Sequence, residues 1–241
     1  MVPMTPLEQK PQTASWTYAA FRHGALAMFP LLPGLMAFSM AFGTVAARKG
    51  FSLADTLLMT GTVYAGMAQM IVMENWPERL TAAAILGTVT VTALVNLRFL
   101  LIGATLRPWL ENEPARKVYP MLFLLTEPNW LLSMRYRADG GRDPCFLLGS
   151  GVVIYVAWVL SAIPGYWLGA SVGDPRAFGL DLIVPAFFVA MLVPLSRGKR
   201  GTVGWVVGGA VAIAADQLIG GFWYLISGAL AGAIAGGLID D

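Results

Sequence analysis

Charged residues in this chain are confined to short stretches, and long apolar segments separate them. An apolar run of about 20 residues is long enough to cross the hydrocarbon core of a bilayer as a helix. We therefore expect an all-α, polytopic membrane protein in which the apolar segments form helices and the polar stretches form loops. The segments are residues 24–47, 56–73, 80–106, 118–134, 145–172, 182–196 and 202–239.

Several segments contain residues that interrupt a helix. Pro30 and Pro33 lie early in the first segment, and proline removes a backbone donor and clashes with the preceding turn. Residues 126–129, Thr-Glu-Pro-Asn, lie inside 118–134, while 202–239 is long enough for two short helices that meet near Asp216. Because transporters build substrate sites from such breaks, the pattern predicts broken or re-entrant helices around a site.

The composition supports a membrane protein and excludes several functions. Of the 241 residues, 57% are hydrophobic and 12% are charged, and the mean hydropathy is +0.66. The basic residues are scattered among short loops and form no stripe for nucleic acid. The only cysteine is Cys145 and the only histidine is His23, at a membrane edge, so we expect no disulfide, metal or cofactor. Residues 1–22 are predicted to be a cytoplasmic tail and residues 23–241 a single transmembrane domain.

The distribution of Lys and Arg among the loops predicts an orientation in the inner (plasma) membrane. Loops 107–117, 135–142 and 197–200 carry three basic residues each, whereas 74–79 and 174–181 carry one each. The positive-inside rule assigns the first three loops to the cytoplasm and the other two to the outside. Segment 118–134 then has a cytoplasmic loop on both sides and is predicted to enter the membrane and return. Segment 24–47, with basic residues at both ends, has the same folded-back alternative.

A weak internal repeat is consistent with a transporter. Gly43…Phe51-Ser-Leu53 is similar to Gly169…Phe178-Gly-Leu180, and each is followed by a short apolar segment. With the orientation above, the two following segments cross the membrane in opposite directions. Inverted repeats of this kind are typical of secondary transporters.

Three charged residues lie inside apolar segments: Arg98, Glu127 and Asp216. A charge at the bilayer centre costs about 3 kcal/mol on insertion scales, so such residues are treated as functional by default. Asn96 adds a second polar side chain beside Arg98. Two other interpretations stay open, namely that Arg98 extends to a lipid headgroup and that Arg98 and Glu127 form a structural ion pair.

Four short motifs resemble those of the AzlC family, the large subunits of branched-chain amino-acid exporters. Tyr64-Ala-Gly-Met-Ala-Gln69 is similar to Tyr-Ala-Gly-x-Ser-Gln, and Asn96-Leu-Arg98 to Asp/Asn-x-Arg. Leu125-Thr-Glu127 is similar to Leu-Thr-Asp/Glu, and Pro30…Pro33…Phe38…Ala41-Phe-Gly43 also fits. The resemblance extends from about Arg22 to the end of the chain, and it rests on the order and spacing of the motifs together.

The resemblance implies a two-component permease that exports leucine, isoleucine, valine and sometimes methionine. It also implies a small hydrophobic membrane partner of the AzlD type. The chain departs from the family motifs at three places, which affects the expected substrate: Ala68 replaces serine, Phe99 replaces a frequent His or Tyr, and Pro128-Asn129 stands where a second acid is common.

We expect Arg98 to hold the carboxylate of the amino acid, because its planar guanidinium matches a carboxylate in two hydrogen bonds. Glu127 or Asp216 would lie near the ammonium group, and either could load and release a proton. For Asp216 a structural or water-exposed role at the helix break is the favoured alternative. The other residues predicted to line the site are Asn96, Thr126, Gln69, Tyr64 and Gly66.

Three of these lining residues have structural alternatives. Tyr64 and Gln69 are five residues apart, so one continuous helix would place them on adjacent faces. Gln69 could merely join two helices by a hydrogen bond, and Gly66 could be a close-packing residue.

Two other classes of function were weighed against transport. An intramembrane enzyme is disfavoured, because the sequence contains no paired-histidine zinc motif and no Ser–His pairing. A membrane scaffold without transport remains the second alternative. The glycine-rich stretch from Gly220 to Gly237 supports close contact with a partner helix.

Overall fold

The computed structural model describes residues 16–74, 76, 79, 81–171, 199–219 and 223–238. Every regular element within these residues is helical, which confirms the all-α prediction. The chain divides into two compact units, Met1–Ile183 and Val184–Asp241, and each is described by itself. The prediction of a single domain over residues 23–241 stays a prediction.

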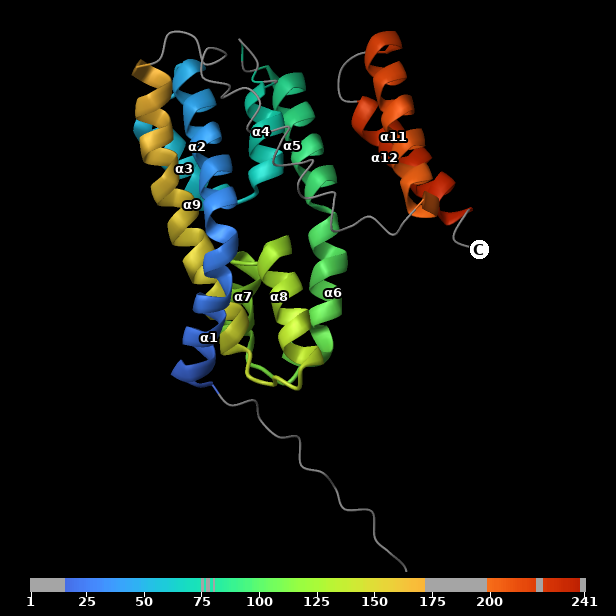
Figure 1. The fold of residues 1–241 in the computed structure, drawn as a ribbon. Helices are drawn as coiled ribbons and strands as arrows, with labels where there is room; N and C mark the ends of the chain where they lie inside the picture. The colour runs from blue at the N-terminus through green and yellow to red at the C-terminus, as the bar shows by residue number, and fades with distance from the viewer. Residues whose placement is uncertain are drawn as a thin grey trace, which may run out of the picture. The chain divides into compact units, whose positions relative to one another are not determined.

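Three helical paths run the full height of the first unit (Figure 1). The first contains α1 (Tyr18–Met28), the short 3-10 helix η1 (Phe29–Leu31) and α2 (Leu32–Arg48). The second contains α5 (Ala82–Asn96) and α6 (Arg98–Leu110), and the third is α9 (Cys145–Ser171). At 1.5 Å per residue these paths are roughly 40–46 Å long, enough to cross a hydrocarbon core of about 30 Å.

The folded-back alternative for residues 24–47 is wrong. Pro30 and Pro33 lie in the first positions of η1 and α2, where a backbone donor is not required. The backbone between α1 and α2 keeps right-handed helical dihedral angles, so the path tightens without reversing.

Two helical hairpins fill half of the height each and enter from opposite ends of the unit (Figure 1). One consists of α3 (Leu53–Val63) and α4 (Gly66–Glu74), the other of α7 (Ala115–Phe123) and α8 (Glu127–Ala138). Their arms are roughly 13–18 Å long and too short to cross a membrane.

Side-chain contacts show that each hairpin returns to the end from which it starts. Phe51 and Trp76 flank the first hairpin, and their ring centroids are 4.8 Å apart. Trp109 and Arg142 flank the second, and Trp109 Nε1 donates to the Arg142 carbonyl at 2.8 Å. Segment 118–134 therefore turns back, as its flanking charges predicted. The prediction that 56–73 crosses the membrane is wrong, because it forms the other hairpin.

Helices α2 and α9 of the first unit pack against each other through small residues. A Cβ atom on Gly43 would overlap the Ala162 carbonyl oxygen, and one on Gly165 would overlap that of Met40. The backbones can approach this closely only because the glycines have no side chain. Ser39 donates to the Trp158 carbonyl, which adds a polar link across the same interface.

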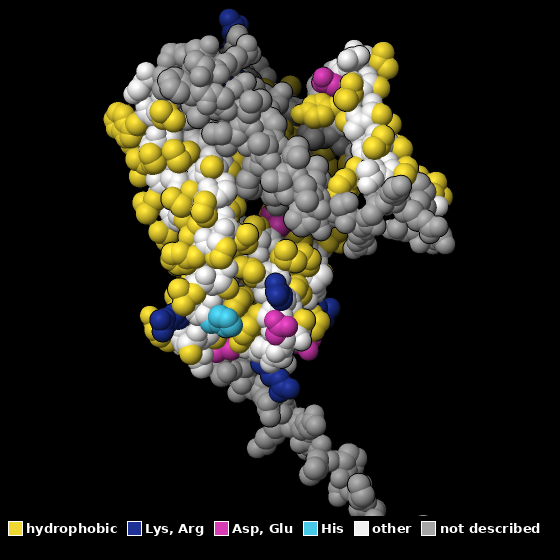
Figure 2. All heavy atoms as spheres, viewed as in Figure 1, with side chains coloured by type: hydrophobic (Ala, Val, Ile, Leu, Met, Phe, Trp, Pro, Cys, Tyr) yellow, Lys and Arg dark blue, Asp and Glu magenta, His cyan; other side chains and the backbone are white. Residues whose placement is uncertain are grey.

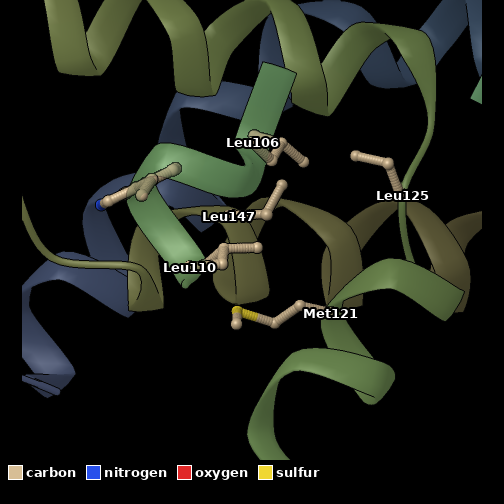
Figure 3. Packing of buried hydrophobic residues seen from close by; sticks show 6 residues of the cluster. Leu106, Leu110, Met121, Leu125 and Leu147 are labelled. Carbon is tan, nitrogen blue, oxygen red and sulfur yellow. The ribbon is translucent and has the colours of Figure 1, made fainter. Parts of the chain in front are cut away.

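A separate apolar cluster fixes the second hairpin against the long paths (Figure 3). It joins α6, α7, the α7–α8 break and α9. Its fully or largely buried members are Leu106, Trp109, Leu110, Met121, Leu125 and Leu147.

The second unit contains α11 (Lys199–Leu218) and α12 (Trp223–Gly237), which confirms two short helices in 202–239. A Cβ atom on Gly204 would lie 2.9 Å from the Gly232 carbonyl oxygen, and one on Gly208 the same distance from that of Gly228. Part of the glycine-rich stretch is therefore used within the chain itself. The second half of the proposed repeat, 169–180, lies largely outside the described residues, as do loop 174–181 and most of the tail.

The surface of the first unit has apolar flanks and charged residues gathered at one end (Figure 2). That end contains the start of α1 and the two basic loops, which the charge pattern had placed on one side. Its described Lys and Arg residues are Arg22, Arg107, Arg116, Lys117, Arg135, Arg137 and Arg142. Those at the opposite end are Arg48, Lys49 and Arg79. The first unit is therefore built as part of a polytopic membrane protein, with more of its described Lys and Arg residues at one end than at the other.

Candidate site at the helix breaks

Three interrupted segments of the first unit touch each other pairwise near its mid-height (Figure 1). Arg98, at the α5–α6 break, lies 2.8 Å from Glu127 at the α7–α8 break, measured from Nε to Oε1. The Nη1 atom of Arg98 donates to the sulfur of Met67, just after the α3–α4 break. Tyr64 and Phe123 close the triangle, with ring centroids 6.1 Å apart. We call residues 64–67, 96–99 and 123–127 together the break junction.

Arg98 and Glu127 are partly accessible rather than sealed. Their side chains are 31% and 29% exposed, although the two atoms that face each other, Arg98 Nε and Glu127 Oε1, are buried. The Nε and Oε1 atoms are close, but the geometry is not that of an aligned hydrogen bond. The structure thus contains the ion pair that the sequence left open, and Arg98 forms it as the first residue of α6. The guanidinium also lies 5.3 Å from the ring of Phe99, in a cation–π contact.

Glu127 is held in place by a hydrogen-bonded cap that includes Asn129. Asn129 is fully buried, and its Oδ1 accepts from the Thr126 backbone N–H at 2.8 Å. Its Nδ2 donates to the Leu124 carbonyl at 2.8 Å, which satisfies a backbone acceptor left free by the break. Glu127 is the first residue of α8, where a carboxylate interacts favourably with the helix dipole. Sequence reasoning did not include Asn129 in the site, although a polar residue three positions after a threonine is a capping signal.

Six of the predicted site residues carry a buried polar side-chain atom without a hydrogen bond. Arg98 Nε and Glu127 Oε1 have each other as ionic partners. Leaving a buried donor or acceptor unpaired costs about 1–3 kcal/mol, so an accumulation of such atoms needs an explanation. The remaining four atoms are Tyr64 Oη, Gln69 Oε1, Asn96 Oδ1 and Thr126 Oγ1.

Tyr64 and Gln69 lie on different helices, so the prediction that they share one helix is wrong. Tyr64 ends α3 in a left-handed conformation with φ of 42°, which stops the helix and starts the return of the chain. Gln69 lies in α4 and donates from Nε2 to the Met59 carbonyl of α3 at 2.8 Å. This bond joins the two arms of the hairpin, and Oε1 of the same amide remains unpaired.

Gly66 has a packing role in this structure. A Cβ atom at this position would lie 2.8 Å from the Trp158 ring and 3.0 Å from the Phe38 ring. The glycine therefore allows α4 to start directly against α2 and α9. It brings the start of α4 into the break junction without supplying a side chain of its own.

An aromatic wall on one side of the junction was not predicted from the sequence. Tyr155 of α9 lies 5.0 Å from Tyr64 and 5.9 Å from Phe123, measured between ring centroids. The Tyr155 hydroxyl donates to the Gly61 carbonyl at 2.9 Å, which fixes the ring. A tyrosine inside an apolar segment gives no sequence signal for this position, because aromatic residues are common throughout membrane helices.

The helix ends supply partial charges of both signs at the break junction. Helices α4 and α8 begin there, and helices α3 and α7 end there. The start of a helix favours a negative group and its end favours a positive group. Together with Arg98 and Glu127, this arrangement suits a small molecule that carries both charges. Asp216 belongs to the second unit, where it lies exposed in α11.

Three membrane-length helical paths and two half-length hairpins that meet at an ion pair define a polytopic membrane protein of the broken-helix class. The comparisons with known proteins agree. The model of the AzlC protein family matches residues 30–172, more than half of the chain, and the chain belongs to that family.

Its relatives include an uncharacterized membrane protein of Archaeoglobus fulgidus, 26% identical over 91% of this chain and 95% of the relative. The branched-chain amino acid transport protein AzlC of Bacillus subtilis is 22% identical over 90% of this chain and 84% of the relative. The inner membrane protein YgaZ of Escherichia coli is 24% identical, over 76% of each chain. No solved structure matches the chain.

Proposed function

We propose that this chain is the large permease subunit of a two-component exporter of small neutral amino acids, with the break junction as its substrate site. The observation that carries the proposal is the partly accessible Arg98–Glu127 pair at the contact of three interrupted segments. Intramembrane charges are costly and are kept where they act on a substrate or an ion. The name of the Bacillus subtilis relative supports branched-chain amino acids as the substrate class.

The unpaired atoms around the pair match the groups of a zwitterion. The Arg98 guanidinium and the start of α8 favour the substrate carboxylate. The acceptor oxygens of Gln69 and Asn96, both without a partner, suit the three N–H donors of the ammonium group. The aromatic wall of Tyr64, Phe123 and Tyr155 would then face the apolar side chain.

Competition for Arg98 offers a route to proton coupling. A substrate carboxylate that binds the guanidinium takes the place of Glu127. The freed carboxylate of Glu127 then holds the ammonium group of the substrate. After the substrate has left on the outer side, a proton takes the place of the ammonium group on Glu127 and is carried inward, opposite to the substrate. Asp216 is the second candidate for this role, as predicted from the sequence.

The orientation and the partner complete the proposal. We place the protein in the inner membrane with the basic end and the N-terminus in the cytoplasm, because seven described Lys and Arg residues lie at that end and three at the other. The resemblance of the motifs to the AzlC family supports a small hydrophobic AzlD-type subunit as the partner.

The test is leucine transport in proteoliposomes with a pH gradient of either sign, prepared with this chain alone and with a small AzlD-type subunit. We expect transport that requires both subunits and that changes with the gradient. Full transport by this chain alone would contradict the need for a partner subunit. A transport rate that does not change with the pH gradient would contradict proton coupling. Absence of transport of any neutral amino acid by the two subunits together would contradict the function itself.

A further inference from the structure

A cavity lies at the charged end of the first unit, away from the break junction. Its volume is about 420 Å³, and it is formed by the turn after α6 and the loop between α8 and α9. The residues that give it its chemistry are Trp109, Asn112, Glu113, Arg137 and Arg142.

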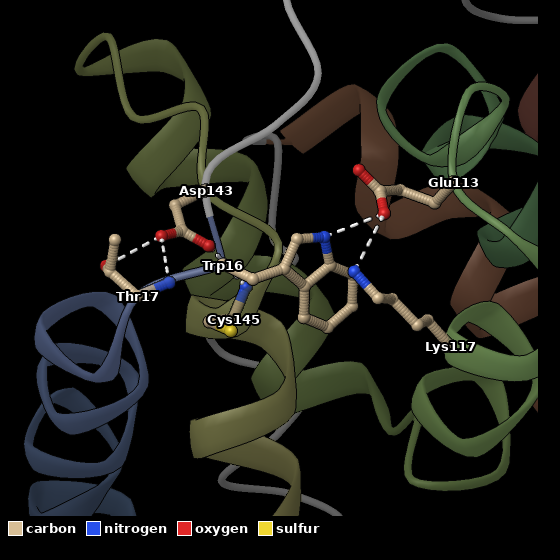
Figure 4. A network of polar contacts seen from close by, with 6 residues as sticks. All are labelled: Trp16, Thr17, Glu113, Lys117, Asp143 and Cys145. Atoms are coloured by element: carbon tan, nitrogen blue, oxygen red, sulfur yellow. Dashed lines mark hydrogen bonds and ion pairs between the residues drawn. The ribbon is translucent and has the colours of Figure 1, made fainter.

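The carboxylate in this cavity is already engaged by other groups. Glu113 Oε2 accepts from Trp16 Nε1 at 2.7 Å and lies 3.8 Å from Lys117 Nζ (Figure 4). Lys117 Nζ also lies 4.1 Å from the centroid of the Trp16 ring. Glu113 therefore already has Lys117 as a counter-charge, and Arg137 and Arg142 add two guanidinium groups to the lining of the cavity.

The cavity has a fixed shape. The Trp109 Nε1 bond to the Arg142 carbonyl holds the two loops together. Gly140 has φ of +91°, a left-handed conformation that turns the chain after α8. Gly141 packs against the ring of Tyr136 so closely that a side chain there would overlap it. The guanidinium of Arg137 lies 5.4 Å from the Trp109 ring, which presents a cation beside an indole wall.

The cavity lies at the end of α6, among the described charged residues of that end of the first unit. Leu100 and Leu101 lie on α6, about two helical turns before the cavity. Their side chains are 70% and 74% exposed, as expected of a lipid-facing surface. Tryptophan and arginine together are typical of the level of the headgroups. A phosphodiester is the anionic group that the bilayer presents at this depth.

We propose that this cavity binds the headgroup of an anionic phospholipid, with the phosphate held by Arg137 and Arg142. Guanidinium groups form charge-assisted hydrogen bonds with phosphate, and basic pockets on the cytoplasmic side of membrane proteins bind such headgroups. The Asn112 amide can donate to the phosphate or to the glycerol hydroxyls. The acyl chains would follow the exposed face of α6.

The test is thermal unfolding of the purified full chain in a neutral detergent, titrated with phosphatidylglycerol or phosphatidylcholine. A bound lipid raises the unfolding temperature in proportion to its occupancy. We expect phosphatidylglycerol to saturate a rise that phosphatidylcholine does not produce. Inorganic phosphate at millimolar concentration separates a lipid site from a soluble-anion site, and it is expected to have no effect.

Substitutions then locate the site. Each arginine would lose a charge-assisted hydrogen bond to the phosphate, so Arg137→Gln and Arg142→Gln should each weaken the apparent lipid affinity roughly tenfold. The matched control is Arg135→Gln, an exposed arginine on the same helix and at the same end that does not line the cavity. It should keep the wild-type affinity.

Three results would overturn the proposal: equal rises with the two lipids, an equal loss in Arg135→Gln, or no loss in the two cavity variants. Native mass spectrometry of the wild-type protein gives a readout that does not depend on folding of the variants. One retained phosphatidylglycerol in excess over phosphatidylcholine is expected, and equal retention of both would contradict the site.

Discussion

The α2–α9 interface and the break junction are built from opposite kinds of contact. Along α2 and α9, glycines bring the backbones together, and Thr44 Oγ1 donates at 2.9 Å to the Gly165 carbonyl across the interface. In the break junction the helices are interrupted, the side chains of the central charges are about 30% exposed, and the polar side-chain atoms of Tyr64, Asn96 and Thr126 have no hydrogen-bond partner.

This difference separates a rigid scaffold from a centre that can rearrange. Contacts between backbones cannot adapt without moving a whole helix, so α2 and α9 are suited to remain fixed. The polar atoms of the junction lose little when Arg98 and Glu127 separate, because most have no hydrogen bond to break. A substrate that satisfies them adds binding energy that the empty protein lacks.

The largest expected effect on function is that of Arg98→Lys. The variant keeps the charge that Glu127 requires but loses the planar fork for a carboxylate. Loss of one charge-assisted hydrogen bond, about 1.5–3 kcal/mol, predicts a roughly tenfold to hundredfold weaker apparent substrate affinity. Transport and the amount of folded protein should be measured on the same preparations.

Two further variants distinguish binding from a purely structural ion pair. Arg98→Ala leaves Glu127 without a cation and should lower the yield of folded protein, and adding Glu127→Gln should restore the yield without restoring transport. Wild-type affinity in a well-expressed Arg98→Lys protein would remove Arg98 from the substrate site.

The scaffold should be most sensitive at its glycines. Gly165→Ala places a methyl group into the Met40 backbone and should destabilise the protein by about 1–3 kcal/mol. Gly103→Ala is the matched control, because a Cβ atom there meets nothing within 4 Å in the first unit's long α6 helix. It should be neutral or stabilising, since alanine favours a helix over glycine by about 1 kcal/mol. Thermal unfolding of the two variants checks the difference; equal stability would contradict close packing as the basis of the scaffold.

A smaller effect, on both stability and transport, is expected at the cap below Glu127. Asn129→Ala removes two buried hydrogen bonds and leaves the Thr126 N–H and the Leu124 carbonyl unpaired, at a cost of about 1–3 kcal/mol shared with local relaxation. Ser133→Ala, one turn further along α8, is the matched control, because this buried hydroxyl has no hydrogen-bond partner. Its stability and substrate affinity should stay at the wild-type level. If both variants lost stability and substrate affinity equally, the effect of Asn129→Ala would come from the loss of a buried side chain and not from the loss of the cap.

Of the three breaks that form the junction, the sequence predicted only the one in 118–134. Charge counts on either side of 118–134 were enough to predict a hairpin, because both loops are short and rich in arginine. The same reasoning failed at 24–47, where Pro30 and Pro33 lie at helix starts and cause no reversal. Segment 56–73 was predicted to cross the membrane, and its break was missed. The break depends on a left-handed conformation of Tyr64, which a tyrosine rarely adopts and which the sequence therefore does not signal.

The candidate site was predictable as far as its charges and motifs, but its packing was not. Arg98 and Glu127 were recognisable because charge is costly inside an apolar segment. Tyr155 was not, since its role arises from a contact with an element distant in sequence. Asn129 makes only local contacts, and its capping pattern was a sequence signal that the prediction did not use. Gly66, predicted as a lining residue, shows how a motif position can serve the backbone, because Trp158 occupies the space beside it. The role of these residues in substrate binding stays a prediction.

The smallest expected effects come from removing one hydroxyl group from each region. Thr44→Val deletes a hydroxyl that donates to the Met40 and Gly165 carbonyls, so it should cost about 1 kcal/mol of stability and leave transport unchanged. Tyr64→Phe deletes a buried hydroxyl that has no partner, so stability should be equal or higher. If the Tyr64 hydroxyl binds the substrate, the apparent affinity should fall roughly twofold to tenfold, the equivalent of one neutral hydrogen bond. Unfolding and transport should be measured on both proteins. We expect Thr44→Val to lower only the stability and Tyr64→Phe to lower only the apparent substrate affinity. A Tyr64→Phe protein that loses stability but transports normally would assign this residue to the scaffold and reduce the junction to its charged pair.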